Sequence, residues 1–508
     1  MNCIITLDIG TSNVKASAFD MEAKLIASRR GTYPTFHPQP DQSEQDPEQI
    51  FLTVLYALKG LLNESLDKKY RPVALVFGAS MHSILPIDRH GIPLRNAIIW
   101  ADNRGRTEAN LLKSSPQGIS IYEATGTPLH PMSPLIKLCW FRNHTPDTWF
   151  GKVYKFVSLK EYIVYQLTGQ WVVDHSMASA TGLFNIHRLE WEPEAMAYAG
   201  IKSQQLSELI PVDFDQLRLK KEYVRLLRLP SSIKLIIGAS DGCLATLGAG
   251  VIGEGNATIS IGASGAVRVA GSHVIQDPQQ RLFNYLLQPG YYVSGGPTNN
   301  GGVVFDWFAQ HLGASGLHLD LEQTVEQLLR EAERVPAGAG GMLFLPFLLG
   351  ERAPLWNANV RGAYIGINIT HERKHFVRAT VEGIVYEIYS IGKLLQQYRS
   401  IEHLYINGSY ATLPLFAQIL ADVFGKAVHI NDQHDSASTG GALLALTHLG
   451  AFDSLEKAVQ TIRVVATYQP IHTHHARYAQ FAELFNRISQ KLLEDFDDLV
   501  ALQNTLLA

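Results

Sequence analysis

The segment Asp8-Ile9-Gly10-Thr11-Ser12 opens the chain's first turn, and its last four residues recur closely as Ile261-Gly262-Ala263-Ser264. Both copies lie between short apolar runs, a pattern that predicts β-strands. The runs are Cys3–Leu7 and Val14–Phe19 around the first copy, and Ala257–Ile261 and Ala266–Ala270 around the second. Each copy therefore predicts a β-hairpin with a Gly/Ser turn, and the position of the second copy near the midpoint favours an internal duplication.

Strand-like and helix-like segments alternate through both halves of the chain. Asp46-Pro47 is typical of a helix start, and apolar residues follow it at helical spacing. Further strands are predicted at Val73–Gly78, Leu404–Ile406 and Ala427–Ile430, and further helices at Tyr154–Leu167, His375–Tyr398, Leu413–Phe424, Ala437–Leu449 and His475–Phe496. We expect a loop at Trp100–Glu108. This alternation predicts an α/β fold whose sheets are partly parallel.

The length of 508 residues exceeds what one hydrophobic core usually supports, so two domains are expected. Glycines cluster in Ala245–Gly255 and are interpreted as a flexible hinge. The predicted domains are 1–247, with the first hairpin, and 248–508, with the second hairpin.

The composition excludes several classes of protein. Hydrophobic residues make up 46% and charged residues 18%, which is typical of a folded globular chain. A formal net charge of −4 offers no general attraction for nucleic acid or an anionic membrane. The three cysteines form neither a disulfide framework nor a four-cysteine zinc site. Without a recognisable signal peptide or membrane span, we expect a cytoplasmic protein.

Two carboxylates stand alone in apolar segments. Asp8 is the only charged side chain between Met1 and Lys15, and Asp241 is the only one between Lys234 and Glu254. Because desolvation disfavours a charged carboxylate, each needs a cation, a metal or hydrogen-bond donors nearby. The alternative for either residue is a strand-end aspartate that caps a turn. Their occurrence together beside glycine turns favours a functional site.

The two glycine turns are suited to phosphate. Glycine allows a phosphate to approach the backbone N–H groups, and hydroxyls of Thr11, Ser12 and Ser264 can donate to it. Lys15 can add positive charge. The alternative is a pair of ordinary hairpin turns. No Walker-type lysine loop is present, and no G-x-G-x-x-G follows the first strand, so a P-loop or Rossmann nucleotide site is disfavoured.

Mixed polar and aromatic segments offer a surface for a sugar. They are Ser80–Ser83, which contains Met81 and His82, and Trp100–Arg104, which contains Asp102. An aromatic face can cover the C–H side of a sugar while planar polar groups bind its hydroxyls. The alternatives are a buried structural histidine for His82 and core packing for Trp100.

At these residues the chain resembles the FGGY carbohydrate kinases. Met132–His144 (MSPLIKLCWFRNH) fits the first signature of that family, and Gly362–Glu382 (GAYIGINITHERKHFVRATVE) fits the second. The resemblance implies a two-domain fold of the actin, hexokinase and Hsp70 type (ribonuclease H-like) with an interdomain cleft. Segments such as EQDPEQIF, SMHSI, WADNR, GTPLHPMSPL and LGERAPLWN are most similar to the gluconate kinases of the family.

The resemblance also implies roles for individual residues. Asp241, expected at the edge of the second domain, would be the general base, and Asp8 would face it across the cleft and hold Mg²⁺ and ATP. The acceptor would contact Asp241 together with Met81, His82, Trp100, Asp102 and Arg104. The phosphates would contact Gly10, Thr11, Ser12, Lys15, Gly262, Ala263 and Ser264. The adenosine would lie near Gly302, Asp306, Gly408 and Ser409.

Two departures from the family pattern stand out. Ala263 occupies a position where the family usually has threonine, which removes a hydroxyl donor but leaves the backbone N–H groups. Thr439-Gly440-Gly441-Ala442 stands where many relatives begin with a charged residue, and the sequence assigns it no role.

The expected function is ATP-dependent phosphorylation of D-gluconate to 6-phosphogluconate. A xylulokinase or another polyol or ketose kinase is the alternative within the family. An actin-like or chaperone-type ATPase is the alternative from another class. Four cationic or neutral donors are candidates to bind a substrate carboxylate: Arg104, Lys137, His82 and His130. The sequence does not choose among them. The partner is a small sugar or sugar acid, and a homodimer is the assembly considered.

Overall fold

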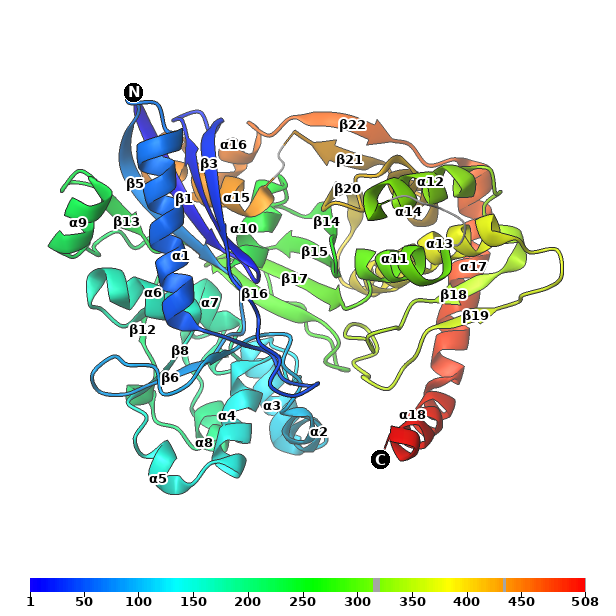
Figure 1. Ribbon diagram of the computed structural model, residues 1–508, viewed down its shortest axis with the longest axis horizontal. Helices are drawn as coiled ribbons and strands as arrows, with labels where there is room; N and C mark the ends of the chain where they lie inside the picture. The colour runs from blue at the N-terminus through cyan, green and yellow to red at the C-terminus, as the bar shows by residue number, and fades with distance from the viewer. Residues whose placement is uncertain (314–319, 433–434, 508) are drawn as a thin grey trace. The chain divides into compact units, whose positions relative to one another are not determined.

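A computed structural model describes residues 1–313, 320–432 and 435–507 (Figure 1). The chain divides into two compact units that interleave along the sequence. Unit 1 comprises Met1–Ile252, Ala270–Ser294 and Asp435–Ile462, and unit 2 comprises Gly253–Val269, Gly295–His434 and Arg463–Ala508. The α/β prediction is confirmed, whereas the proposed sequence boundary at 247/248 stays a prediction.

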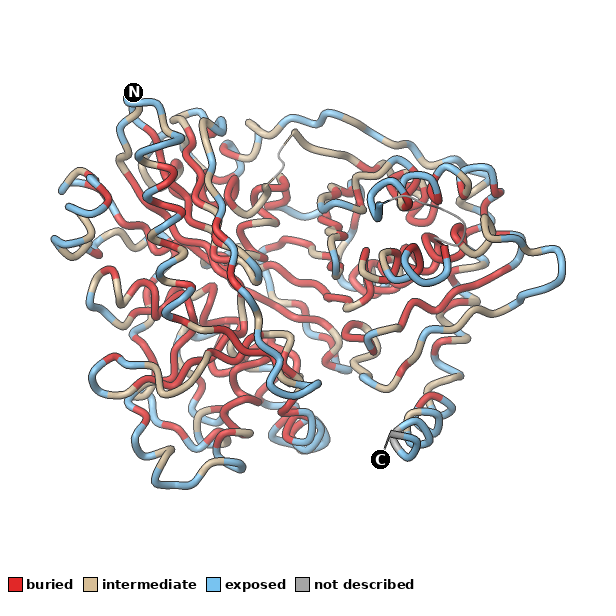
Figure 2. The backbone as a smooth tube through the Cα atoms, in the orientation of Figure 1, coloured by how far each residue is buried: buried red, intermediate tan, exposed pale blue. Residues whose placement is uncertain are grey.

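Unit 1 contains a five-stranded mixed sheet (Figure 1). Its strand order is β13 (Lys234–Ile236), β5 (Arg71–Ala79), β1 (Asn2–Ile9), β2 (Asn13–Phe19) and β3 (Leu25–Thr32). The strands β1, β5 and β13 run parallel, and β1, β2 and β3 form antiparallel pairs. The central strands β1 and β5 are nearly continuous apolar runs because both faces of the sheet are covered (Figure 2).

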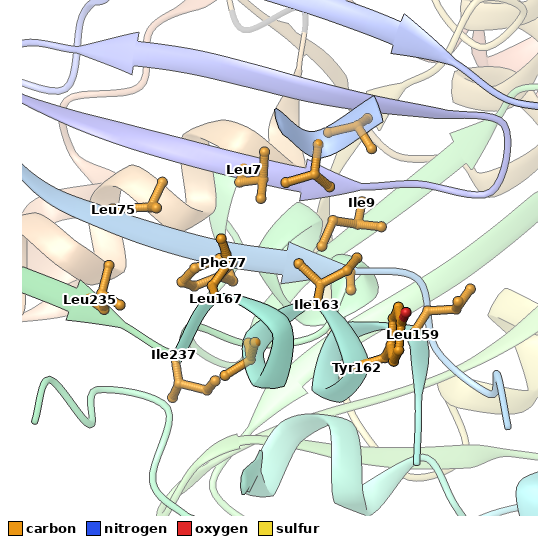
Figure 3. Close-up of a cluster of buried hydrophobic side chains, with 14 of the residues drawn as sticks. Leu7, Ile9, Leu75, Phe77, Leu159, Tyr162, Ile163, Leu167, Leu235 and Ile237 are labelled. Atoms are coloured by element: carbon orange, nitrogen blue, oxygen red, sulfur yellow. The ribbon is translucent and has the colours of Figure 1, made fainter. Parts of the chain in front are cut away.

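Alternate residues of these strands enter two different cores. Leu7, Ile9, Leu75 and Phe77 pack on one face against Leu159, Tyr162, Ile163 and Leu167 of α6 (Leu159–Thr168), together with residues of α1 (Pro47–Gly60) (Figure 3). Ile4, Ala74 and Val76 pack on the other face against α10 (Asp241–Gly248) and α15 (Ser436–His448). The period-2 pattern of the strands therefore produces a three-layered unit.

The remaining elements of unit 1 are short strand pairs and helices. The short strand pairs are β4 (Glu44–Gln45) with β7 (Ala97–Ile98), β6 (Leu85–Ile87) with β8 (Lys155–Val157), β9 (Val172–Asp174) with β12 (Glu208–Ile210), and β10 (Phe184–Asn185) with β11 (Glu190–Trp191). The other helices are α2 (Arg106–Lys113), α3 (Pro116–Thr125), α4 (Pro134–His144), α5 (Asp147–Phe150), α7 (His175–Ser179), α8 (Pro193–Ala199), α9 (Lys221–Leu227) and α16 (Leu455–Val459).

A seven-stranded sheet contains the second hairpin. Its order is β16 (Phe283–Gln288), β17 (Tyr291–Thr298), β15 (Gly265–Gly271), β14 (Gly255–Ile261), β20 (Ile401–Asn407), β21 (Val428–Asn431) and β22 (Val464–Tyr468). The division between the units falls within β15 and β17. The strand β14 pairs antiparallel with β15 and parallel with β20, as β1 pairs with β2 and β5. The predicted repeat of the hairpin is thus confirmed.

The helices of unit 2 include the long buried α13 (Arg373–Leu395), whose first part, Arg373–Glu382, forms the end of the second signature. The others are α11 (Gly302–Phe308), α12 (Leu321–Glu333), α14 (Pro414–Phe424), α17 (His472–Lys491) and α18 (Leu493–Leu507), and the strand pair is β18 (Leu343–Leu345) with β19 (Ala363–Ile365). Within the described ranges, no helix has the length and apolar character needed to cross a membrane.

Three local predictions were wrong. The segment Tyr154–Leu167 begins with β8 and only then becomes α6, because Lys155–Val157 pairs with Leu85–Ile87. The expected loop Trp100–Glu108 ends at Arg106, where α2 begins. Gly248, one of the glycines interpreted as a flexible hinge, lies inside α10. Glycine is needed there because a Cβ would be 1.8 Å from the carbonyl oxygen of Ser436.

Candidate active site

The parallel strands of unit 1 bring three segments with predicted site residues to one edge of the sheet. Asp8 lies at the end of β1, Met81 and His82 follow β5, and Asp241 follows β13. Ala79 and Ser240 form a parallel bridge, which extends the β5–β13 pairing to the start of α10. Because the carboxyl ends of parallel strands meet at one edge, residues distant in sequence become neighbours there.

The first glycine turn is held by side chains from three other segments. The Gly10 N–H donates to the Asn13 carbonyl at 2.9 Å, and the Tyr33 hydroxyl donates to the Gly10 carbonyl. Gln45 Nε2 donates to the Thr11 carbonyl, and Trp100 Nε1 donates to Thr11 Oγ1 at 2.9 Å. These bonds fix the turn in advance of any ligand. Trp100, expected at the sugar, is thereby joined to the turn expected at the phosphates.

Asp8 is a buried acceptor with unusual electrostatics. Its Oδ1 is buried and has no hydrogen-bond partner among the described residues. Burial, followed by the charges of Asp435 and Asp241, raises the pKa of Asp8 from 3.8 to about 8, and Lys15 acts in the opposite direction. A carboxylate in this position therefore calls for a cation to offset its charge.

Asp435 is a charged neighbour of Asp8 that the sequence did not reveal. It caps α15 by accepting from the Ser438 N–H at 3.1 Å, and its Oδ2 lies 2.8 Å from Lys15 Nζ. Burial acts to raise the pKa of Asp435, but the bonds to Lys15 and Ser438 outweigh this, so that its pKa is lowered. Lys15 is therefore engaged by Asp435.

The residues around Asp8 suit a magnesium ion that brings most of its own ligands. No group of three or more His, Cys, Asp or Glu side chains that could hold a metal occurs among residues 1–313, 320–432 and 435–507. The unpartnered Asp8 Oδ1 nevertheless provides one hard oxygen ligand. Mg²⁺ commonly uses one or two carboxylates and takes its other oxygens from water and substrate phosphates. The observed donor fits that mode of binding.

Asp241 belongs to unit 1, together with Asp8, so the expectation that the two carboxylates come from opposite domains was wrong. It begins α10, where the Gly242 N–H donates to its Oδ1 at 2.7 Å. Asp8 pairs with Gly78, and Ala79 bridges to Ser240, so the two carboxylates lie at neighbouring strand ends; beside burial and Asp435, the charge of Asp241 raises the pKa of Asp8. They meet because β1 and the β5–β13 pair end at the same edge of one sheet.

The His82 side chain is fixed at both ring nitrogens. Its Nδ1 lies 2.7 Å from the Ala180 carbonyl, which can only accept, so Nδ1 carries a proton. Its Nε2 lies 3.0 Å from the Tyr285 hydroxyl. The backbone of His82 is left-handed, with φ of 68°. The neighbouring Met81 is half-buried and packs against both cores of the unit. The His82 ring is therefore held in one orientation at this edge of the sheet.

Arg104 and Asp102 form a buried ion pair. Arg104 Nε donates to both Asp102 oxygens at 2.9 and 3.0 Å, and Nη2 donates to Glu44 at 2.7 Å. Asp102 also accepts from the Ser43 N–H at 2.7 Å. Both side chains are almost completely buried, at 2% and 0% exposure. These bonds make the pair part of the buried structure, and direct substrate contact by either residue stays a prediction.

The Lys137 side chain is also buried and makes hydrogen bonds within the protein. Its Nζ donates to the carbonyl oxygens of His82 and Met132 at 2.6 and 2.7 Å. Burial lowers the pKa of Lys137 to about 7, with Asp102 acting against this shift and Arg104 adding to it. Lys137 therefore joins the His82 turn to the segment that contains His130.

The predicted nucleotide residues of unit 2 also cluster. The Gly302 and Val303 N–H groups donate to the carbonyls of Gly262 and Ala263 at 2.7 and 3.1 Å. A Cβ on Gly408, whose φ is 94°, would lie 2.5 Å from the Ile261 carbonyl oxygen. The Tyr410 hydroxyl donates to Asp306, and Ser409 is exposed beside it. Ser264 lies in the same turn as Gly262 and Ala263. The seven predicted nucleotide residues of unit 2 therefore lie near the ends of β14 and β20: Gly262, Ala263, Ser264, Gly302, Asp306, Gly408 and Ser409.

Comparison with known proteins connects this arrangement to an established family. Models of the FGGY family of carbohydrate kinases match residues 3–248 with the N-terminal domain and residues 257–449 with the C-terminal domain. A gluconokinase of Bacillus licheniformis is 33% identical over 508 residues, covering 99% of this chain and 98% of that protein. These matches are consistent with both signatures read from the sequence.

Two solved structures are similar over nearly the whole chain. A gluconate kinase from Lactobacillus acidophilus has a TM-score of 0.93 and 31% identity, covering 98% of this chain and 99% of that one. A ligand-bound xylulose kinase from the same organism also has a TM-score of 0.93 and 31% identity, covering 98% and 100%. The fold is therefore the two-domain fold of sugar kinases, and both substrate classes occur among its neighbours.

Proposed function

Since the chain belongs to the FGGY family of carbohydrate kinases and phosphorylates a sugar hydroxyl, we propose that its acceptor is D-gluconate and its product 6-phosphogluconate. The named gluconokinase relative and the gluconate kinase structure support this acceptor. The xylulose kinase structure makes D-xylulose the rival acceptor. Membership of this family leaves the filament or chaperone alternative without support.

We assign the proton transfer to Asp241. The observation that carries this role is that Asp8 pairs with Gly78 while the next residue, Ala79, bridges to Ser240, so that Asp8 and Asp241 lie at neighbouring strand ends on one edge of one sheet. Asp241 would accept the proton of the acceptor hydroxyl as its oxygen attacks the γ-phosphorus of ATP. The bond between that phosphorus and the β,γ-bridging oxygen breaks, and ADP leaves with the electron pair.

Asp8 would hold the metal of the nucleotide through its unpartnered Oδ1. Bound Mg²⁺ offsets charge on the phosphate oxygens. Ser12 and the N–H groups of the first glycine turn would contact the phosphates, and Lys15, paired with Asp435, would add positive charge. Gly262, Ala263 and Ser264 of unit 2 would also contact the phosphates, and Gly302, Asp306, Gly408 and Ser409 would contact the adenosine.

Recognition of a sugar acid needs a donor for its carboxylate, and we assign this role to His130. Arg104, Lys137 and His82 are each at least 92% buried and make hydrogen bonds to other protein groups. His130 is half-buried, and its Nδ1 accepts from the Met132 N–H at 3.1 Å. His130 is thus the most exposed of the four candidates, and an imidazole N–H is a suitable donor for a carboxylate.

Steady-state kinetics with ATP and purified protein test the function. We expect kcat/KM to be highest for gluconate among gluconate, xylulose, ribulose and glycerol. Asp241→Asn removes the base at nearly constant shape, so kcat should fall by about 100-fold or more while substrate KM changes much less. A higher kcat/KM for xylulose would replace the proposed acceptor, and normal turnover of Asp241→Asn would reject the proposed base.

Assembly and location remain predictions. We propose a cytoplasmic protein and, as the assembly to test, a homodimer. Sedimentation equilibrium of the full chain distinguishes a monomer from a dimer of the 56.3 kDa protein.

A further inference from the structure

A lysine lies completely buried in the core of unit 1. Lys160, in the first turn of α6, has a side chain that is 2% exposed. Its Nζ donates to Asp174 Oδ2 at 2.7 Å and to the Ala239 carbonyl at 3.2 Å. The Asp174 side chain is 0% exposed, and its Oδ1 caps α7 by accepting from the Met177 N–H at 2.8 Å. Two distant segments are thus joined to the backbone just before Asp241.

The turn that contains Ala239, Ser240 and Asp241 has a second buried attachment. Ser176 Oγ lies 2.9 Å from Ser240 Oγ and accepts from the Ser240 N–H at 3.2 Å, and both serines are 0% exposed. Ser176 belongs to α7, the helix that Asp174 caps. Lys160, Asp174 and Ser176 therefore hold the carbonyl of one residue and the N–H of the next, directly before Asp241.

A general need for stability does not explain this arrangement well. Taking an ammonium and a carboxylate out of water is costly, and well-packed apolar residues often replace such a pair without loss of stability. The pair instead restricts the conformation of the turn before Asp241. Lys160 Nζ can donate to both Asp174 and the Ala239 carbonyl in only a narrow range of turn geometries. The charge of Lys160 also interacts with that of Asp241. Both effects act on the reactive carboxylate without touching the substrate.

We propose that Lys160 and Asp174, with Ser176, are positioning residues that hold Asp241 in the orientation needed to accept the acceptor proton. This role presupposes the proposed function, in which Asp241 is the base. A base displaced by even about 1 Å loses much of its effect, so loss of the support should lower kcat more than it raises KM.

The test is a double-mutant cycle between Lys160→Met and Asp241→Asn, measured with ATP and the better acceptor of gluconate and xylulose. Methionine has nearly the length of lysine without its charge. We expect Lys160→Met to lower kcat by about 10- to 100-fold while KM for ATP stays within about twofold. In the Asp241→Asn background the same change should lower kcat by less than about threefold, because a missing base cannot be misplaced.

Ser176→Ala provides a second cycle that leaves the ion pair intact. It removes both bonds to Ser240, and kcat should fall about threefold to tenfold in the native background and remain unchanged in Asp241→Asn. If Lys160→Met does not fold, this cycle decides the question. Arg378→Met is the matched control, because Arg378 and Glu382 form a similarly buried pair in α13 of unit 2. Its effect on kcat should be the same in both backgrounds.

The outcomes separate the two proposals. Equal effects of the Lys160 and Ser176 changes with and without Asp241 would show a purely structural role and overturn the positioning proposal alone. Normal kcat in a folded Lys160→Met would do the same. Normal kcat in Asp241→Asn would reject the base, and the positioning proposal would fall with it.

Discussion

At the scale of single residues, the buried carboxyl group of Asp8 destabilises the folded state when it is charged. Its pKa is raised by burial and by the charges of Asp435 and Asp241, so protonation stabilises the folded state. That stabilisation is complete below the ordinary pKa of 3.8 and is lost as the pH rises through about 8. If this position contributed only to stability, an uncharged side chain would be expected in place of Asp8.

Asp8→Asn should therefore raise the melting temperature by an amount that grows with pH while abolishing turnover. Asparagine has a similar shape and no charge, so the cost of ionisation disappears. Thermal unfolding at pH 5, 7 and 9 measures this difference, with Asp67→Asn as the control because Asp67 is exposed. An equal gain at all three pH values would contradict the raised pKa of Asp8.

A second prediction at this scale concerns the acceptor carboxylate. His130→Ala removes the imidazole donor, so KM for gluconate should rise about tenfold or more, whereas KM for a neutral ketose should change by less than about twofold. Steady-state kinetics with both acceptors measure the ratio, and the exposed His90→Ala is the control. Equal changes for both acceptors would remove His130 from acid recognition.

At the scale of elements, α10 and α15 approach each other backbone to backbone. A Cβ on Gly440 would lie 1.9 Å from the Leu244 carbonyl oxygen, which explains the glycine whose role the sequence left open. On the adjacent Gly441 the nearest atom would be 3.6 Å away, an ordinary contact. Since α10 begins with Asp241 and α15 is capped by Asp435, this contact sets the relative position of these two carboxylates.

Gly440→Ala should destabilise the protein by about 1–3 kcal/mol or more through overpacking and should lower kcat. Gly441→Ala should leave stability unchanged or raise it by up to about 1 kcal/mol, because alanine is the better helix former. Chemical denaturation of both variants measures the difference. Equal stabilities would contradict the close approach of the two helices.

At the scale of the whole molecule, the sequence predicted what depends on local pattern. Glycine turns between apolar runs located both hairpins, and Asp46-Pro47 located the start of α1, whose first N–H groups donate to Asp46. Contacts between distant segments could not be predicted in this way. Lys160 and Ala239 are 79 residues apart in sequence. Asp435 is the residue at which the chain re-enters unit 1 after the segment Gly295–His434 of unit 2. No local pattern encodes either neighbour.

The duplicated hairpin has a consequence for the history of the molecule. In the paired strands, Asp8 lies opposite Lys15 in the first copy, whereas the corresponding pair in the second copy is Ser260 and Ala266. If the copies descend from one ancestral half, the charged pair distinguishes the present halves and is confined to one of them. The first hairpin would then have gained, or the second lost, its charged residues after the two halves were joined.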